Sequence, residues 1–340
     1  MSAVKLPVDL TMRLDELLAQ AATGDQRATA RLASIVERQN AETQALRGVL
    51  GERPRNAHRV GVTGSPGVGK SSLIARMAEH LSSEGKSVAV VAVDPSSKVT
   101  GGATLGDRIR MAETAMQPGV FVRSLASRSS DDGLAPAAFG MVNLFDTLGY
   151  DYVLLETVGA GQNQIAIADA VHTLVLIEAP GTGDSVQMLK AGLMEVADIY
   201  AVTKADLPGA HLIDRELRAM ISLGSESIHE WTAPVILCSA ESGDGIWSIV
   251  EAIDEHSAYL ARTALLGDSN RLILRSELEA ELNRLVAQSI EASLRSGDLI
   301  EGMLGGTVSM KEAVQRVTAL LAATPAPHVT TASGETRGER

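Results

Sequence analysis

The feature that most restricts the fold of this chain is a glycine-rich run from Gly64 to Ser71, which reads G-x-x-x-x-G-K-S. The residues before it, Arg59–Thr63, form a short and mostly apolar run that suits a buried strand. The residues after it, Ser72–Leu81, carry apolar side chains at helical spacing. A strand, a loop of this pattern and a helix, in that order, make a phosphate-binding loop. The pattern therefore predicts an α/β fold built around such a loop.

The residue types in this loop suit a phosphate group. Glycine lets backbone N–H groups approach phosphate oxygens without a Cβ in the way, and the following helix adds partial positive charge at its N-terminus. Lys70 can reach the β- and γ-phosphates, and the Ser71 hydroxyl can hold Mg²⁺. An ordinary glycine-rich turn is the alternative, which the complete pattern and its flanks disfavour. The predicted nucleotide-binding residues here are Gly64, Ser65, Pro66, Gly67, Val68, Gly69, Lys70, Ser71 and Ser72.

Short apolar runs alternate with helical patterns as far as about residue 262. This alternation is typical of βαβ units and predicts a mainly parallel sheet flanked by helices. Several runs are apolar throughout, as expected when helices cover both faces of a sheet. The predicted strands are Arg59–Thr63, Val88–Val93, Tyr152–Leu155, Thr173–Ile177, Ile199–Thr203 and Val235–Cys238.

The patterns divide the chain into a central domain with helical extensions. We expect a helical N-terminal extension over residues 1–56, a nucleotide-binding domain over 57–262, a helical arm over 263–324 and a disordered tail over 325–340. In the arm, helices are predicted over Leu272–Leu294 and Met310–Leu321, with a turn around Gly297 and Gly302–Gly306 between them. The apolar stripe of the first arm helix is longer than one domain edge requires, so we expect the arm to form a homodimer.

Acidic residues stand where ligands of open α/β sheets bind, beyond the carboxyl ends of the strands. Asp94 follows Val93, and Glu156 follows Leu155. Asp107 lies in a polar loop, residues 101–110, of the kind that γ-phosphate and metal can order. For one acid alone, a helix cap or a solvated turn is an equally good interpretation. We predict Lys70, Asp94, Asp107 and Glu156 as catalytic residues, Ser71, Asp94, Asp107 and Glu156 as metal ligands, and Gly159 as a nucleotide contact.

Two short elements at later strand ends suit a guanine base. Thr203-Lys204-Ala205-Asp206 matches the pattern N-K-x-D with Thr in place of Asn. The Asp206 carboxylate can accept hydrogen bonds from guanine N1–H and from its amino group, and adenine offers no such pair of donors. Ser239-Ala240-Glu241 matches a turn whose backbone N–H meets guanine O6. Because Thr203 lacks the amide of Asn, we expect looser discrimination between bases. Each element alone could be an ordinary polar turn.

The composition excludes several kinds of partner. A net charge of -12, with no basic stripe, argues against nucleic acid as a ligand. The single cysteine, Cys238, is expected to be buried and excludes a disulfide framework. No apolar run approaches the roughly 20 residues of a membrane-spanning helix. The N-terminus shows no signal peptide, so we expect a cytoplasmic protein without a membrane partner.

With these motifs in place, the chain resembles the methylmalonyl-CoA mutase-associated GTPases, in the branch of P-loop GTPases that carries Glu in the third nucleotide-binding motif. The resemblance covers residues 57 to about 260. The matching stretches are Gly64–Ser72, Ala92–Ser97, Thr100–Gly102 with Leu105–Asp107, Glu156–Gly159 with Gly161 and Gln162, and Lys204–Asp206.

This resemblance implies a dimeric GTPase chaperone for an adenosylcobalamin-dependent acyl-CoA mutase, which would gate cofactor loading and guard the mutase from inactivation. GTP or GDP with Mg²⁺ would be the ligands. Residues 181–190, with Gln187 and Lys190 matching, would form a further switch toward the client. Thr203 and the loop Ser127–Leu134 depart from the family pattern, so a related mutase acting on another acyl-CoA is an open alternative.

Three rival interpretations remain. A metal-insertion GTPase needs Cys- or His-rich ligand sets, which one cysteine and seven scattered histidines disfavour. A kinase of proteins or small molecules needs an acceptor site and commonly a basic lid, and the sequence shows neither clearly. Asp254-Glu255-His256 begins a cobalamin-binding pattern, but Tyr259 stands in place of its glycine. A chance occurrence on the surface of a helix is the favoured interpretation of that stretch.

Overall fold

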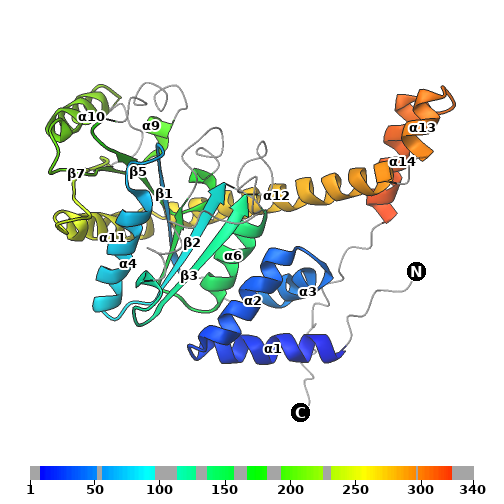
Figure 1. Cartoon of the computed structure of the whole chain (residues 1–340), viewed down its shortest axis with the longest axis horizontal. Coiled ribbons are helices and arrows are strands. Elements are labelled where there is room, and N and C mark those ends of the chain that lie inside the picture. Colours follow the sequence, from blue (N-terminus) through cyan, green and yellow to red (C-terminus); the bar gives the residue numbers. More distant parts are fainter. Residues whose placement is uncertain are drawn as a thin grey trace, which may run out of the picture.

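The computed structural model describes residues 8–51, 56–95, 113–127, 136–156, 167–181, 193–224, 231–295 and 298–323. Its strands are β1 (His58–Gly64), β2 (Val88–Pro95), β3 (Val120–Ser127), β4 (Tyr152–Glu156), β5 (Thr173–Glu178), β6 (Ile199–Val202) and β7 (Val235–Leu237). They form one seven-stranded sheet in the order β3-β2-β4-β1-β5-β6-β7, in which every neighbouring pair is parallel (Figure 1). The predicted α/β class with a parallel sheet is confirmed.

One strand was not predicted. β3 lies at the edge of the sheet and carries Arg123 in the middle of its length, which interrupts the apolar run. That arginine forms an ion pair with Glu37 on helix α2 (Gln26–Arg38). An edge strand covered by a helix can hold a paired polar side chain, so the sequence pattern alone did not reveal it.

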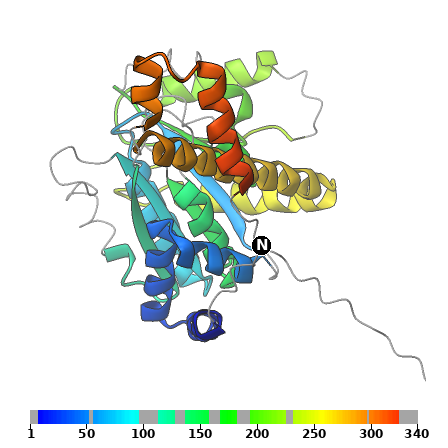
Figure 2. The same ribbon diagram turned by 90° about the vertical axis from the view of Figure 1, so that its right-hand side faces the viewer.

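Helices cover both faces of the sheet (Figures 1 and 2). On one face, α4 (Lys70–Ser83) and α11 (Ile246–Arg262) share an apolar core with Val62 of β1 and Val90 of β2. On the other face, α6 (Pro136–Thr147) and the short helix η1 (Ala168–Ala170) belong to the same apolar core as Val91 of β2. Successive residues of a strand thus supply opposite layers. Beyond them, α9 (Leu193–Val196) precedes β6, and α10 (Ala210–Gly224) covers β6 and β7.

The N-terminal helices α1 (Val8–Ala22), α2 and α3 (Ala41–Leu50) pack beside the sheet rather than apart from it. Asp25 caps α2, and Asn40 forms a capping box with Thr43 at the start of α3. Leu14 and Leu32 belong to the same buried cluster as Phe145 of α6. The helices of the expected N-terminal extension therefore share a core with the nucleotide-binding domain.

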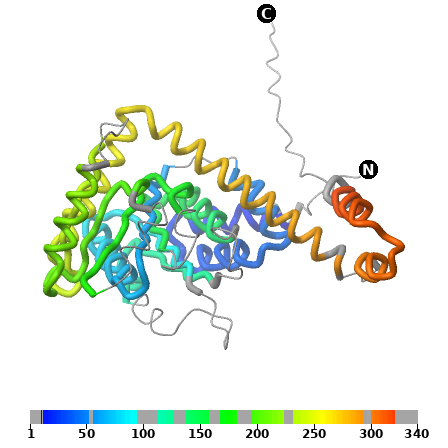
Figure 3. The backbone as a smooth tube through the Cα atoms, turned by 90° about the horizontal axis from the view of Figure 1, so that it is seen from above, coloured from blue at the N-terminus to red at the C-terminus, as the bar shows by residue number. Residues whose placement is uncertain are grey.

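A long helix, α12 (Leu265–Arg295), leads from the sheet to a pair of short helices, α13 (Asp298–Leu304) and α14 (Met310–Ala323), at its far end (Figure 3). In its first half, Ile273 is buried. The turn expected over 302–306 is partly wrong, because Gly302 lies inside α13. A Cβ on Gly302 would stand 2.6 Å from Val308, so this glycine serves close packing. No helix among the described residues is long and apolar enough to cross a membrane.

Candidate nucleotide-binding site

The glycine-rich loop leaves the carboxyl end of β1 in the middle of the sheet. Gly64 has φ of 150°, and a Cβ there would lie 2.3 Å from the carbonyl oxygen of Ile177 on β5. Gly69 has φ of 100° and forms the N-cap of α4. Glycine is the residue that adopts these conformations without strain. Val68 is fully buried and anchors the loop, whereas Pro66 and Gly67 are exposed at its rim.

Lys70 begins α4 and lies inside the loop. Its Nζ donates hydrogen bonds to the carbonyl oxygens of Gly64, at 2.9 Å, and of Ser65, at 3.0 Å. The residue is 8% exposed, so its charge is held within the cradle rather than in bulk solvent. A buried cation at the N-terminus of a helix is suited to bind a phosphate group.

The hydroxyl of Ser71 reaches the second predicted element. It donates a hydrogen bond to Glu156 Oε1 at 2.7 Å, and Glu156 is 7% exposed at the end of β4. Register places Glu156 beside Val62 of β1 on one side and Ala92 of β2 on the other. A hydroxyl and a carboxylate at this separation are hard oxygen donors, which suit Mg²⁺. Ser72 follows and is half-buried.

Only some of the other predicted acids and switch residues belong to the part of the chain that the structure describes. Asp94 lies on β2, two positions beyond the residue that pairs with Glu156, so its backbone stands at the same edge of the sheet. Asp107 and Gly159 lie outside the described residues, as do Gln187 and Lys190 and the loop from residue 128 to 135.

The first base-reading element is tied to the glycine-rich loop. The Thr203 hydroxyl lies 2.5 Å from the carbonyl oxygen of Val68 and 3.1 Å from that of Glu178. Lys204 Nζ donates to the carbonyl of Gly67 at 2.9 Å. Two successive loop carbonyls are therefore held by two successive residues of this element. Asp206 is exposed just beyond them, where its carboxylate is open to a ligand.

The second base-reading element lies beside the first. Ala205 N donates to the carbonyl of Cys238 at 3.0 Å, which joins the two turns directly. Cys238 is fully buried, as expected, and burial raises the pKa of its thiol to about 12. Ser239 N donates to the carbonyl of Asp244 at 2.9 Å and closes a tight loop that also contains Ala240 and Glu241. The structure thus brings Thr203, Lys204, Asp206 and Ser239–Glu241 together beside the phosphate loop.

Sequence reasoning missed Glu178. This residue ends β5 and is 3% exposed, and its carbonyl accepts a hydrogen bond from Thr203 N at 2.8 Å. The signal was available, because Glu178 directly follows the predicted apolar strand, just as Asp94 and Glu156 follow theirs.

The predicted surface position of His256 is wrong. It lies on the predicted helix, but it is 3% exposed rather than on the surface.

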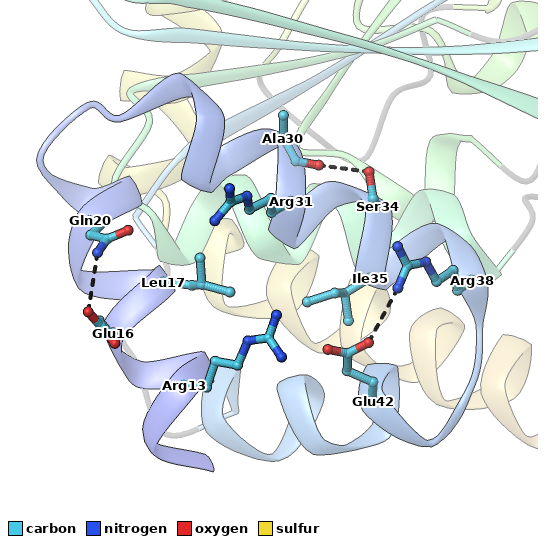
Figure 4. Close-up of a pocket in the computed structure, with 10 residues that line it drawn as sticks. All are labelled: Arg13, Glu16, Leu17, Gln20, Ala30, Arg31, Ser34, Ile35, Arg38 and Glu42. Atoms are coloured by element: carbon cyan, nitrogen blue, oxygen red, sulfur yellow. Dashed lines mark hydrogen bonds and ion pairs between the residues drawn. The ribbon is translucent and has the colours of Figure 1, made fainter. Parts of the chain in front are cut away.

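A separate cavity of about 510 Å³ lies between α1, α2 and α3 (Figure 4). Arg13 and Arg31 extend into it from different helices, and Leu17 and Ile35 supply its apolar wall. This cavity has no glycine-rich backbone cradle and lies away from the carboxyl ends of the strands. The strand ends therefore remain the better nucleotide site.

Comparison with known proteins agrees with this geometry. The sequence model of the methylmalonyl-CoA mutase-associated GTPase family, MeaB, matches residues 29–296. A GTPase-family protein of Pyrococcus abyssi is 40% identical over 290 residues, which cover 85% of this chain and 90% of the relative. GTPase ArgK of Escherichia coli K12 is 34% identical over 290 residues, covering 81% of this chain and 86% of that protein.

The fold agrees as well. A solved structure described as a LAO/AO transport system kinase aligns with a TM-score of 0.62 and 26% sequence identity, and the alignment covers 94% of this chain and 100% of that one. The resemblance expected from the motifs is confirmed: the chain belongs to the methylmalonyl-CoA mutase-associated GTPase family, MeaB, and it is a GTP hydrolase.

Proposed function

We propose that this GTPase is a chaperone that gates cofactor loading and protects an adenosylcobalamin-dependent acyl-CoA mutase. The observation that carries the proposal is the hydrogen bonding between the first base-reading element and the phosphate-binding loop. Thr203 donates to the carbonyl of Val68, and Lys204 donates to the carbonyl of Gly67. A site built in this way recognises one nucleotide as a unit and suits a switch. The family description, which associates its members with methylmalonyl-CoA mutase, supports the identity of the client.

In this proposal the residues of the cradle act on the phosphates. The Lys70 ammonium and the backbone N–H groups of the loop stabilise negative charge on the β- and γ-phosphates. Ser71 and Glu156, whose side chains meet at 2.7 Å, would hold Mg²⁺ together with Asp94 and Asp107. When bound, the metal supplies neutralisation of phosphate charge. A carboxylate of this set orients the attacking water.

The base would lie over Lys204. The Asp206 carboxylate would accept hydrogen bonds from N1–H and the amino group of guanine, and a backbone N–H of the Ser239–Glu241 turn would meet O6. Asp206→Asn places a donor where guanine also presents donors, so GTP should bind more weakly and xanthosine triphosphate more tightly. Wild-type preference for ATP over GTP in direct competition would contradict this assignment.

We also propose that the arm forms a homodimer. Its long helix exposes apolar side chains four residues apart along one stripe, each between 40% and 60% exposed: Leu274, Leu278, Leu282, Val286, Ile290 and Leu294. An exposed apolar stripe of this length favours a partner surface. Leu278→Glu with Leu282→Glu should convert a dimer into a monomer in light scattering, with intrinsic GTP turnover unchanged. Arg271→Glu with Arg275→Glu, exposed on the same helix, is the matched control.

The decisive experiment measures GTP turnover with and without the purified mutase, and cofactor transfer to the mutase with GTP, a non-hydrolysable analogue and GDP. We expect faster turnover with the mutase and transfer that depends on the nucleotide. Lys70→Ala should remove both effects. Unchanged turnover together with nucleotide-independent transfer would reject the chaperone role.

The relative described as a transport system kinase makes phosphoryl transfer the second candidate. Radiolabelled γ-phosphate on a protein or small molecule would favour it.

A further inference from the structure

Arg76 connects the helix that follows the phosphate loop to the second base-reading turn. It lies on α4, and its Nε donates a hydrogen bond to the carbonyl oxygen of Ala240 at 2.8 Å. Its Nη1 lies 3.0 Å from Glu79 Oε2, one helical turn further along α4. The guanidinium is a planar fork, so a carboxylate held by one nitrogen fixes the direction of the other. Glu79 therefore orients the group that contacts Ala240.

The contact acts on the peptide unit that joins Ala240 to Glu241. A peptide unit is planar and trans, so the carbonyl of Ala240 and the N–H of Glu241 point in opposite directions. A donor that fixes the carbonyl on the α4 side therefore fixes the Glu241 N–H away from α4. That N–H belongs to the turn expected to meet the O6 atom of guanine.

The rest of the turn is held by its own residues. Ser239 N donates to the carbonyl of Asp244, and Gly243 N donates to the carbonyl of Ser239, both at 2.9 Å. Gly245 has φ of 72°, and a Cβ there would lie 2.1 Å from the carbonyl of Leu237, so the exit of the turn is fixed by glycine. These contacts close the ends of the turn. Among the described residues, the carbonyl of Ala240 near its tip has Arg76 as its donor.

The helix that carries Arg76 is itself well placed. α4 begins at Lys70 in the phosphate cradle, and its His80 ring meets the Trp247 ring of α11 edge to face, with centroids 4.8 Å apart. α11 begins at Ile246, just after the loop that Ser239 and Asp244 close. The same helix therefore begins inside the glycine-rich loop with Lys70 and contacts the turn through Arg76.

We propose that Arg76 is a positioning residue for base recognition: its hydrogen bond to Ala240 aims the turn at the 6-position of the base. The inference rests on the proposed role of Ser239–Glu241 in reading guanine. It names a specificity determinant outside the base-reading motifs, on the phosphate-binding helix.

The test compares nucleotides that differ at single positions of the base. Arg76→Met keeps the apolar stem and removes the donors, and binding is measured with GTP, ITP and ATP in competition against a fluorescent GDP analogue. Guanine and hypoxanthine share O6, whereas adenine carries an amino group there. We expect the variant to bind GTP and ITP about three- to tenfold more weakly, in equal measure, as the loss of one hydrogen bond predicts. ATP binding should stay the same.

Matched variants separate this inference from the function on which it rests. Glu79→Gln removes the charge beside Arg76 but leaves the Ala240 contact, so it should change GTP affinity less than Arg76→Met. Asp206→Asn should weaken GTP more than ITP, because ITP lacks the amino group that Asp206 would bind. If Asp206→Asn shows this pattern while Arg76→Met leaves the ratio of GTP to ATP affinity unchanged, the inference is wrong. If Asp206→Asn has no effect on GTP, the proposed base reading itself fails.

A structural role alone would give a different pattern. If Arg76 only stabilised the fold, Arg76→Met would lower the melting temperature and weaken all three nucleotides alike, and that result would overturn the proposal. An unchanged melting temperature with selective loss for bases that carry O6 would support it. 6-Thio-GTP, whose sulfur is a weak acceptor, should distinguish the wild type from the variant less than GTP does.

Discussion

The two ends of the central strands are both rich in polar groups, but they are built in opposite ways. At the carboxyl ends, side chains bond to the backbone. Lys70, Thr203 and Lys204 donate hydrogen bonds to carbonyl oxygens of the glycine-rich loop. At the amino ends, side chains bond to one another. His58 Nε2 and His256 Nδ1 each lie 2.8 Å from the hydroxyl of Thr173. The first arrangement holds the backbone of a loop in place, whereas the second joins side chains of different elements to one another.

Burial strongly perturbs titration at the amino ends. It lowers the pKa of His58 to about 3, with smaller contributions from His172 and His256, and that of His256 to about 4, with a smaller contribution from His172. It also raises the pKa of Asp198 to about 7. Beside this cluster, Arg59 lies 2.9 Å from Asp146 of α6 and 3.0 Å from Glu277 of α12.

At the amino ends of the strands, the perturbed pKa values therefore result from burial in the packed core and do not identify a catalytic site. Perturbed groups often cluster at functional sites, but structural ion-pair networks perturb pKa values as well. The amino-end cluster joins the sheet to α6 and to the arm, and we interpret it as structural. Four substitutions can test this division between a chemical end and a structural end.

The largest effect is expected at the chemical end. Lys70→Ala removes the cation from the cradle and should lower the rate of GTP hydrolysis by about two to three orders of magnitude, the size typical for loss of one preorganised charge-stabilising group. The contacts that the substitution removes include those of Lys70 Nζ with the loop carbonyls of Gly64 and Ser65, so we expect the melting temperature to change less than the rate of hydrolysis. Steady-state phosphate release and thermal unfolding measure the two quantities. Near-normal turnover would contradict the role of Lys70.

The reverse pattern is expected at the structural end. Arg59→Met leaves Asp146, which is 2% exposed as a side chain, without its guanidinium partner. Removal of one member of a buried ion pair costs about 3–5 kcal/mol of unfolding free energy. Hydrolysis per folded molecule should stay near the wild-type rate. Denaturant unfolding measures the loss, and Arg59→Met with Asp146→Leu should recover part of it. A full loss of turnover in folded Arg59→Met protein would contradict the division.

A smaller effect concerns pH. The unfolded chain protonates His58 near pH 6.5, whereas the folded protein keeps it neutral down to about pH 3. Between these values the unfolded state binds more protons, so stability falls as the pH drops through this window. His58→Gln can keep the hydrogen bond to Thr173 without titrating, and it should therefore lose about 2 kcal/mol less than the wild type between pH 6.5 and 5.

A second group, Asp198, changes the stability of the protein in the opposite direction over the same pH range. The raised pKa of Asp198 acts in the opposite direction, because the folded state binds the extra proton between pH 3.8 and about 7 and so gains stability as the pH falls. This contribution is present in both proteins, so the difference between their unfolding free energies isolates His58. Identical pH dependence in the two proteins would show that the His58 ring does not titrate as burial predicts.

The same division explains what could be predicted from the sequence. The chemical end consists of short motifs that are continuous in the chain, such as Gly64–Ser71 and Thr203–Asp206, and their flanking strands are strongly apolar. The structural end joins residues 115 and 83 positions apart, namely His58 with Thr173 and Thr173 with His256. Only the strand order brings them together, and no local pattern encodes it. Because its partners are so far away in the sequence, His256 was wrongly predicted to lie on the surface.

The smallest effect concerns the Thr in place of Asn at position 203. Thr203 lacks the amide of Asn, yet its hydroxyl lies 2.5 Å from the carbonyl of Val68 and donates to the phosphate loop. Thr203→Val has nearly the same shape but cannot donate, and it leaves that carbonyl without this partner. We expect a loss of about 1 kcal/mol in GDP and GTP binding, close to a fivefold rise in Kd. Thr203→Ser keeps the hydroxyl and is the matched control. Titration with a fluorescent GDP analogue measures both, and equal affinities for the Val and Ser variants would show that the hydroxyl does not brace the loop.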